Sequence, residues 1–288
     1  MRFVEHRVGD RRVIRLVRKW LKAGVMEDGV LVPGEIGTPQ GAVISPLLAN
    51  IYLHYVFDLW AERWRRREAR GTVILVRYAD DIVAGFERKD DAERFRADMR
   101  ARLAQFALTL HPDKTRLIEF GRFAAANRRR RGQDKPETFD FLGFTHIAGR
   151  SRRGHFLLLR RSRRDRKRGR LKAIKDELRR RMHDPIPAQG RWLRQVVVGY
   201  LAYHAVPTNG ATLAAFRYHV QQIWMRALRR RGQKGRISWD RMKAITDRWL
   251  PKPRILHPWP AQRFAVKYPR WEPDAGNPLV RFCAGGAQ

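Results

Sequence analysis

The adjacent pair Asp80-Asp81 has the clearest potential for chemistry in this sequence. Two apolar runs, residues 73–76 and 82–86, flank it so closely that the pair must occupy or border a hairpin turn. Adjacent carboxylates repel each other, and apolar surroundings strengthen that repulsion. A hard divalent cation such as Mg²⁺, which prefers carboxylate and phosphate oxygens, would neutralise the pair. An ordinary Asp-Asp turn is the competing interpretation, and the dipeptide alone favours it.

A second candidate is the glycine-bracketed loop at residues 37–41 (GTPQG). Ser45-Pro46 follows it in the order that favours a helix N-cap and first helical residue. A loop with the Gln40 side chain and exposed amides, leading into a helix start, suits contact with a phosphate or sugar backbone. A plain strand-to-helix connector is the alternative, and loop chemistry alone favours that alternative.

Together with two later segments, these motifs resemble the reverse transcriptases encoded by group II introns, the intron maturases. Residues 37–53 (GTPQGAVISPLLANIYL) resemble the family's template-and-nucleotide loop with its helix, and residues 77–81 (RYADD) resemble its catalytic hairpin. Residues 108–120 (LTLHPDKTRLIEF) resemble the segment after the palm helix, and residues 139–145 (FDFLGFT) resemble the hairpin that grips the primer end. Four motifs in the family's order are specific, whereas any one alone is not.

The resemblance implies functional roles for these segments. Asp80 and Asp81 would be the catalytic carboxylates that hold Mg²⁺ in two-metal polymerisation. Lys114 would lie near the incoming nucleotide, although a solvent-exposed turn lysine is the commoner case. The residues implied in contacts with template, nucleotide or primer are Gln40, Gly41, Lys114, Phe141, Leu142 and Gly143.

In the same family a third aspartate, on a strand well before the glycine-bracketed loop, completes the metal site. Residues 1–29 already resemble the segment after that strand, and neither Asp10 nor Asp28 falls on an apolar strand. We therefore expect a C-terminal part of a maturase, truncated or split, that is inactive by itself. A separate chain that supplies the missing half remains open, as does a non-catalytic RNA-binding splicing cofactor or an inactive remnant. A metal-dependent nuclease fits the order of the four motifs less well.

The charge of the chain indicates the class of partner. Lys and Arg number 62 against 28 acidic residues, a net charge of +34, so the chain should bind polyanions with salt-sensitive affinity. By resemblance, the expected partners are group II intron RNA, an RNA template and a DNA primer. Residues 160–170 (RRSRRDRKRGR) are the densest basic run. The arginines expected to bind RNA are Arg160, Arg161, Arg163, Arg164, Arg166, Arg229, Arg230 and Arg231.

Other classes of site and location are disfavoured. Cys283 is the only cysteine, which excludes an intramolecular disulfide framework and a Cys-rich zinc site. The nine histidines lack paired metal-ligand spacing. No apolar run is long enough for a transmembrane helix, and residues 1–10 lack the apolar core of a secretory signal. We expect a cytoplasmic ribonucleoprotein component without a membrane partner.

The pattern of apolar residues predicts the elements that position these motifs. Helical periodicity predicts helices at residues 11–23 and 45–66, around residues 92–106, 192–201 and 213–227, and after Ser238. Strands are expected at residues 73–76, 82–86, 108–110, 116–120, 139–145 and 154–159, with a charged loop at residues 127–135. Near the C-terminus, aromatic residues would stack on unpaired bases or complete a small core: Trp259, Phe264, Tyr268 and Trp271.

This order of elements predicts an α+β fold. Residues 1–159 would form a partial reverse-transcriptase palm, and residues 160–288 an all-helical thumb and maturase RNA-binding domain. The boundary is placed at the abrupt rise in basic residues that begins at Arg160.

Overall fold

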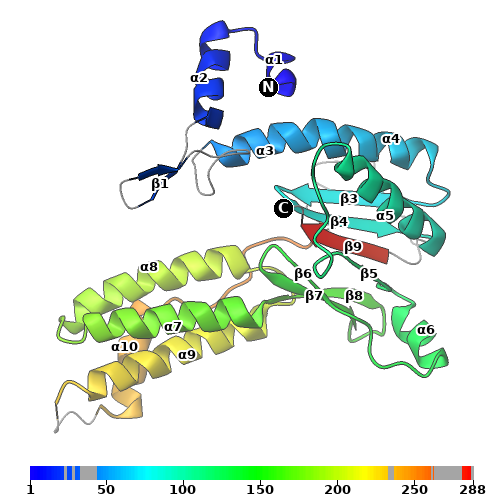
Figure 1. Ribbon diagram of the computed structural model, residues 1–288. Helices are drawn as coiled ribbons and strands as arrows, with labels where there is room; N and C mark the ends of the chain where they lie inside the picture. Colours follow the sequence, from blue (N-terminus) through cyan, green and yellow to red (C-terminus); the bar gives the residue numbers. More distant parts are fainter. Residues whose placement is uncertain are drawn as a thin grey trace. The chain divides into compact units, whose positions relative to one another are not determined.

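The computed structural model describes residues 1–22, 25–27, 30–32, 44–232, 237–260, 262 and 281–286. Gln40, Gly41, Phe264, Tyr268 and Trp271 lie outside the described residues. The chain forms two compact units, residues 1–120 with 278–288, and residues 121–277. Figure 1 shows their helices and strands. The composition boundary at Arg160 falls near the end of strand β8 (Phe156–Ser162), inside the second unit.

The first unit contains the long helix expected after the glycine-bracketed loop. It consists of α3 (Ser45–Leu53), a π-helical segment η1 (His54–Asp58) and α4 (Leu59–Arg67). Its N-cap is Ile44 rather than Ser45, so the predicted capping residue was one position too late. Pro46 is therefore the second residue of the helix rather than the first. Proline is tolerated there because the backbone N–H groups of the first turn have no partner within the helix.

A four-stranded sheet carries the aspartate hairpin. Its order is β3 (Val73–Tyr78), β4 (Asp81–Phe86), β9 (Arg281–Gly286) and β5 (Arg116–Ile118), and all neighbours are antiparallel. Both hairpin strands and β5 confirm the strands predicted there. Strand β9 was not predicted, because its run of RFCAGG holds two glycines, which disfavour strands, and its partners lie far away in the sequence.

Residues 108–110 do not form the predicted strand. They follow helix α5 (Lys89–Ala104), which ends with Ala107 in the left-handed conformation at φ 54°. The Leu108 N–H then donates to the Leu103 carbonyl at 3.0 Å, the long-range bond of a Schellman motif. Leu108 therefore belongs to a helix end, and only Leu110 forms a single β-bridge.

The core of the first unit lies between the sheet and its helices. Phe95, Met99 and Leu103 of α5 are buried against strand residues that include Ile82 and Phe86. This confirms the predicted apolar face of α5. The short remaining elements of this unit are α1 (Arg2–Glu5), α2 (Arg11–Lys22, as predicted), β1 (Val25–Glu27) and β2 (Val30–Val32).

The second unit combines a three-stranded antiparallel sheet with a helical bundle. The sheet has the order β6 (Phe139–Phe141), β7 (Phe144–Arg150) and β8. The bundle consists of α7 (Arg164–Arg180), α8 (Ile186–His204), α9 (Gly210–Arg229) and α10 (Trp239–Trp249). Its core includes Leu193, Phe216 and Trp224, and the Ser238 hydroxyl caps α10 as predicted.

Helix α6 (Ala124–Arg130) corrects the first part of the charged loop predicted at residues 127–135, and residues 131–135 form the turn and loop expected there. Three alanines, the strongest helix formers, begin the helix, and arginines follow in its last turn, where cations are favoured. In the described part of the chain, no helix combines the length and the apolar character needed to cross a bilayer.

Candidate active site and nucleic-acid interface

Asp80 and Asp81 lie at the tip of the β3–β4 hairpin. Ala79 and Asp80 form a two-residue turn, and Asp81 begins β4 opposite Tyr78. Both aspartates are exposed, and Tyr78 is 64% exposed beside them. The apolar strands therefore support the carboxylates without enclosing them. Ala79 has a φ of 53°, a left-handed conformation that a residue with a Cβ rarely adopts.

Arg77 holds this turn in place. Its Nε and Nη2 donate to the two carboxylate oxygens of Asp58, each at 2.6 Å. Its Nη1 donates at 2.8 Å to Asn50 Oδ1 and at 2.8 Å to the carbonyl of Ala79 inside the turn. The Arg77 side chain is 14% exposed, and the hydrogen bonds that it donates to Asp58 raise its pKa further above the ordinary arginine value.

The position of Arg77 in β3 carried a signal that the sequence analysis did not use. Alternate residues of a strand share a face, so Arg77 lies on the same face as Val73 and Leu75, which pack in the core. A charged residue at such a position requires a partner. The partner, Asp58, ends the π-helical segment η1, and π-helical turns often occur at functional sites.

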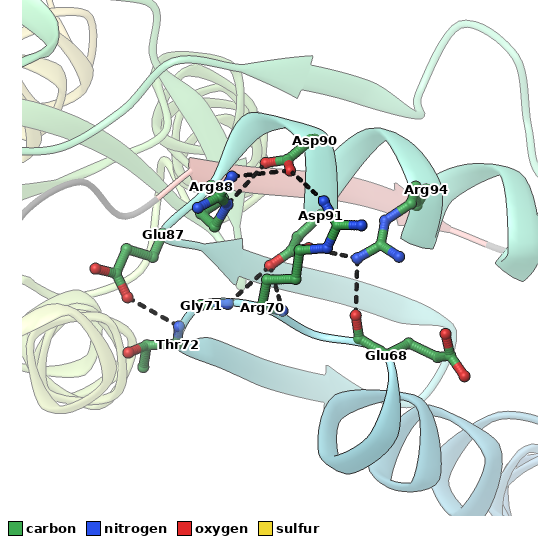
Figure 2. Close-up of polar contacts among 9 residues, drawn as sticks. All are labelled: Glu68, Arg70, Gly71, Thr72, Glu87, Arg88, Asp90, Asp91 and Arg94. Atoms are coloured by element: carbon green, nitrogen blue, oxygen red, sulfur yellow. Dashed lines mark hydrogen bonds and ion pairs between the residues drawn. The ribbon is translucent and has the colours of Figure 1, made fainter.

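A second set of contacts fixes the opposite end of the hairpin, as Figure 2 shows. Asp91 is fully buried at the start of α5, and its Oδ2 accepts from the backbone N–H groups of Arg70 and Gly71, both at 2.9 Å. Its Oδ1 accepts from Arg94 Nη2 at 2.6 Å, and the same nitrogen donates to the Glu68 carbonyl at 2.7 Å. Asp91 therefore joins α5 to the segment that enters β3.

Two further carboxylates near this end also serve the fold. Glu87 Oε2 accepts from the Thr72 N–H at 2.9 Å, which lowers the pKa of Glu87. Asp90 accepts from Arg88 Nε at 3.1 Å, and this hydrogen bond lowers the pKa of Asp90. Both groups already have protein partners, whereas the acidic pair at the tip of the hairpin has none among the residues that the structure describes.

The carboxylates of Asp80 and Asp81 could supply some, but not all, of the ligands of a magnesium ion. Mg²⁺ usually binds through one or two carboxylates and completes its octahedral shell with water and substrate phosphates. Asp80 and Asp81 supply hard oxygen ligands at an exposed position. Among the described residues, no three His, Cys, Asp or Glu side chains gather into a metal site. The pair alone would therefore leave most of the coordination shell to other oxygens.

The second predicted hairpin lies in the second unit. Leu142 and Gly143 connect β6 to β7 with φ angles of 48° and 75°, a two-residue turn with both central residues left-handed. The Tyr203 hydroxyl of α8 donates to the Leu142 carbonyl at 3.0 Å, and its ring stacks on Phe144 with centroids 5.8 Å apart. Phe141 closes the turn opposite Phe144. Helix α8 thus holds this turn through Tyr203, which the sequence analysis missed.

The predicted RNA-binding arginines differ in their surroundings. Arg164 and Arg166 are exposed on α7, and Arg160 and Arg161 lie on β8. Other arginines contact the protein: Arg163 pairs with Asp140 and Asp165, Arg229 donates to the Ile237 carbonyl, and Arg231 donates to the Asp184 carbonyl. Arg230 is the C-cap residue of α9.

In the first unit, Lys114 is exposed in a turn closed by the Thr115 N–H bond to the His111 carbonyl.

Comparison with known proteins connects these features to a family. Residues 5–146 match the family described as reverse transcriptase (RNA-dependent DNA polymerase), a family whose polymerases generally use a divalent metal ion. Protein YkfC of Escherichia coli is 31% identical over 184 residues, which cover 54% of this chain and 44% of that protein.

Two shorter matches are to proteins of introns. The group II intron-encoded protein LtrA of Lactococcus lactis subsp. cremoris is 48% identical over 48 residues, 17% of this chain and 8% of LtrA. An uncharacterized 91 kDa protein in the cob intron of Schizosaccharomyces pombe is also 48% identical over 48 residues, 6% of its length. The chain spans less than half the length of each of these relatives. Residues 5–146 therefore form a reverse-transcriptase domain, and the chain is related to the proteins that group II introns encode.

Proposed function

We propose that this chain acts as part of an intron-encoded RNA-directed DNA polymerase and maturase, with Asp80 and Asp81 as its metal-binding carboxylates. The observation that carries the proposal is the exposed acidic pair on a hairpin that is braced at both ends, within a reverse-transcriptase domain. The remaining carboxylates of that region hold protein groups, so they compete poorly for a metal ion.

We assign separate roles to the metal-binding residues, to Arg77 and to the second hairpin. Asp80 and Asp81 would hold Mg²⁺, which activates the primer hydroxyl and neutralises the triphosphate in two-metal polymerisation. Arg77 would keep the turn in one conformation by its bond to the Ala79 carbonyl, so that the carboxylates need no reorganisation on binding. The turn of Leu142 and Gly143 would support the primer end, with Tyr203 fixing its backbone.

The proposed partners are RNA and DNA strands: intron RNA, a template and a primer. The net charge of +34 supports attraction to all three, and the relation to intron-encoded proteins supports the RNA component. We also propose a cytoplasmic location as a ribonucleoprotein. The family relation favours polymerisation over the alternative of a splicing cofactor without catalysis.

The first test measures metal binding at the hairpin. Mn²⁺ as a probe should broaden the NMR signals of residues around the tip, with weak affinity because two carboxylates leave much of the shell to water. Asp80→Asn should remove this broadening and leave the fold unchanged. Asp90→Asn, which also alters one member of an Asp-Asp pair, is the matched control and should retain it. Broadening centred elsewhere in the chain would contradict the assignment.

The second test measures primer extension on an RNA template. The chain would be assayed alone and with the upstream segment of a related intron-encoded protein added in trans. Any extension should disappear in Asp80→Asn and persist in Asp90→Asn. Extension that survives Asp80→Asn would remove this residue from the active site. RNA binding without extension in any combination would favour the splicing cofactor.

A further inference from the structure

The helical bundle of the second unit has an open groove between α7 and α9, with a volume of about 910 Å³. That volume lies at the upper end of the range for ligand sites, about 300–1,000 Å³, although this groove is open rather than enclosed. Six cationic side chains line it: Arg164, Lys167, Arg168, Lys172, Lys175 and Arg226.

The cations follow one side of α7. Arg164, Arg168, Lys172 and Lys175 recur at intervals of three or four residues, the spacing of one helical face. Eleven residues separate the first from the last, roughly 16 Å along the helix axis at 1.5 Å per residue. The adjoining face of α7 is buried through Ile174 and Leu178. Because the bundle packs against that buried face, the cationic side chains of α7 stay aligned along the groove.

These charges are not neutralised by the nearby acids. Asp165 of α7 pairs with Arg163 at 2.6 Å, and Glu177 pairs with Arg180 and Arg181 at 3.2 and 2.7 Å. Within the part of the chain that the structure describes, no ion pair includes any of the six groove cations. Like charges gathered along one groove repel each other, and a polyanion that lies in the groove would relieve this repulsion.

Aromatic side chains stand beside the cationic row. Tyr218 of α9 lines the groove and is 50% exposed. Trp239, 42% exposed at the start of α10, contacts its ring edge-on with centroids 6.2 Å apart. Gln222 Nε2 donates to the Tyr218 hydroxyl at 2.9 Å, which fixes the phenol ring. An exposed, oriented ring next to a line of cations is the combination that holds single-stranded nucleic acids.

We propose that the α7–α9 groove binds a single-stranded segment of RNA, with its phosphates along the cations of α7 and a base stacked on Tyr218. A single strand is favoured over a duplex because paired bases do not offer their faces to a side chain. The inference rests on the proposed function, since it assigns a place to the RNA that the chain is proposed to bind. It deepens that function by locating the site and naming the form of the RNA.

The test uses the full chain and a fluorescent single-stranded RNA of about 12 nucleotides, within the usual site sizes for single strands. Anisotropy titrations at several salt concentrations give the affinity and its salt slope. The double variant Lys172→Gln, Lys175→Gln should make the slope shallower by about 1.4, because each single-strand phosphate contact contributes about 0.7. The control Arg191→Gln, Arg194→Gln removes two exposed charges at the same spacing on α8, outside the groove, and should leave the slope unchanged.

Stacking is tested separately. Tyr218→Ala should weaken binding of the single strand roughly five-fold or more. Tyr218→Phe, which keeps the ring but lacks the hydroxyl held by Gln222, should weaken it less. Binding of a hairpin duplex should not respond to either change. Circular dichroism would verify that each variant keeps its helical content.

Two outcomes would overturn the assignment: equal slope changes in the groove variant and its control, or unchanged affinity in Tyr218→Ala. The wild-type chain could bind RNA with a steep salt slope while the groove variants change neither slope nor affinity. In that case the groove is not the RNA site, but the proposed RNA partner stands. If the wild-type chain shows no salt-dependent RNA binding, the proposed RNA partner fails, and the groove with it.

Discussion

Arg77 ties the turn of its own hairpin to residues of η1 and α3 that are distant along the chain. Its guanidinium reaches Asp58, Asn50 and the Ala79 carbonyl at once, across 19, 27 and 2 residues of sequence. Only a planar group with a fork of N–H donors can make all these bonds together. The left-handed conformation of Ala79 costs free energy, and its bond to Arg77 helps to keep the turn in that conformation.

At this scale we predict that Arg77→Lys loosens the aspartate turn. A lysine ammonium cannot reproduce the two parallel bonds to Asp58, so we expect a loss of about 1–2 kcal/mol in unfolding free energy. We also expect weaker Mn²⁺ binding at Asp80 and Asp81, because the ordered turn is lost. Denaturant unfolding and Mn²⁺ titration measure the two effects.

The matched control is Arg100→Lys, an exposed arginine on α5 away from the hairpin. It should leave both quantities unchanged. If Arg77 acts through Asp58, the double variant Arg77→Lys, Asp58→Asn should lose less than the sum of the single variants. Additive losses, or an unaltered Mn²⁺ affinity in Arg77→Lys, would contradict a positioning role.

At the scale of elements, the β3–β4 hairpin is braced at both ends by side chains from helices. The tip is tied to η1 through Arg77, and the base is tied to α5 through Asp91. Burial of a carboxylate is costly unless hydrogen bonds satisfy it, and Asp91 accepts three of them. A hairpin alone is marginally stable, so these ties and the core beneath the sheet give it one defined position.

We predict that Asp91→Ala destabilises the first unit by roughly 1–3 kcal/mol. The change leaves the N–H groups of Arg70 and Gly71, which donate in part-buried hydrogen bonds, without their acceptor, and the loss of such bonds carries about that cost. The neighbouring Asp90→Ala, which alters an exposed carboxylate, should cost far less. Chemical denaturation of both variants measures the difference, and equal stabilities would show that the Asp91 contacts contribute little.

At the scale of the whole molecule, positive charge dominates the sequence. With 62 basic and 28 acidic residues, attraction to RNA should extend over much of the chain rather than depend on one contact. The groove cations supply a defined path on α7, whereas Arg163, Arg229 and Arg231 have protein partners. If the chain binds RNA as proposed, total charge would contribute mainly to the affinity, and local geometry to the position of the RNA.

We predict a steep dependence of RNA affinity on salt. If about six to ten phosphates are contacted, affinity should fall roughly 10³-fold or more between about 50 and 200 mM salt. Filter binding over this range measures the slope. A shallow slope would mean that few phosphates are contacted and that most basic side chains face water rather than RNA.

Much of the fold could be predicted from the sequence because its signals are local. The apolar face of α5 follows from helical periodicity, and the β3–β4 hairpin follows from two apolar runs too close for any other connection. The same locality explains the failures at residues 108–110 and 127–130, where a helix end and a short helix replaced a strand and part of a loop. Apolar and charged runs by themselves do not distinguish these states.

The sequence by itself determined the acidic pair, the order of the motifs and the attraction to polyanions, since these depend on residue type, spacing and net charge. The tertiary structure alone decided that Arg77 meets Asp58, that β9 pairs with β4 and β5, and that cations of α7 face Tyr218 of α9 across a groove. Each of these joins segments far apart in the chain. Their meeting depends on how apolar faces pack to exclude water, and periodicity within one segment does not specify which distant segment completes the packing.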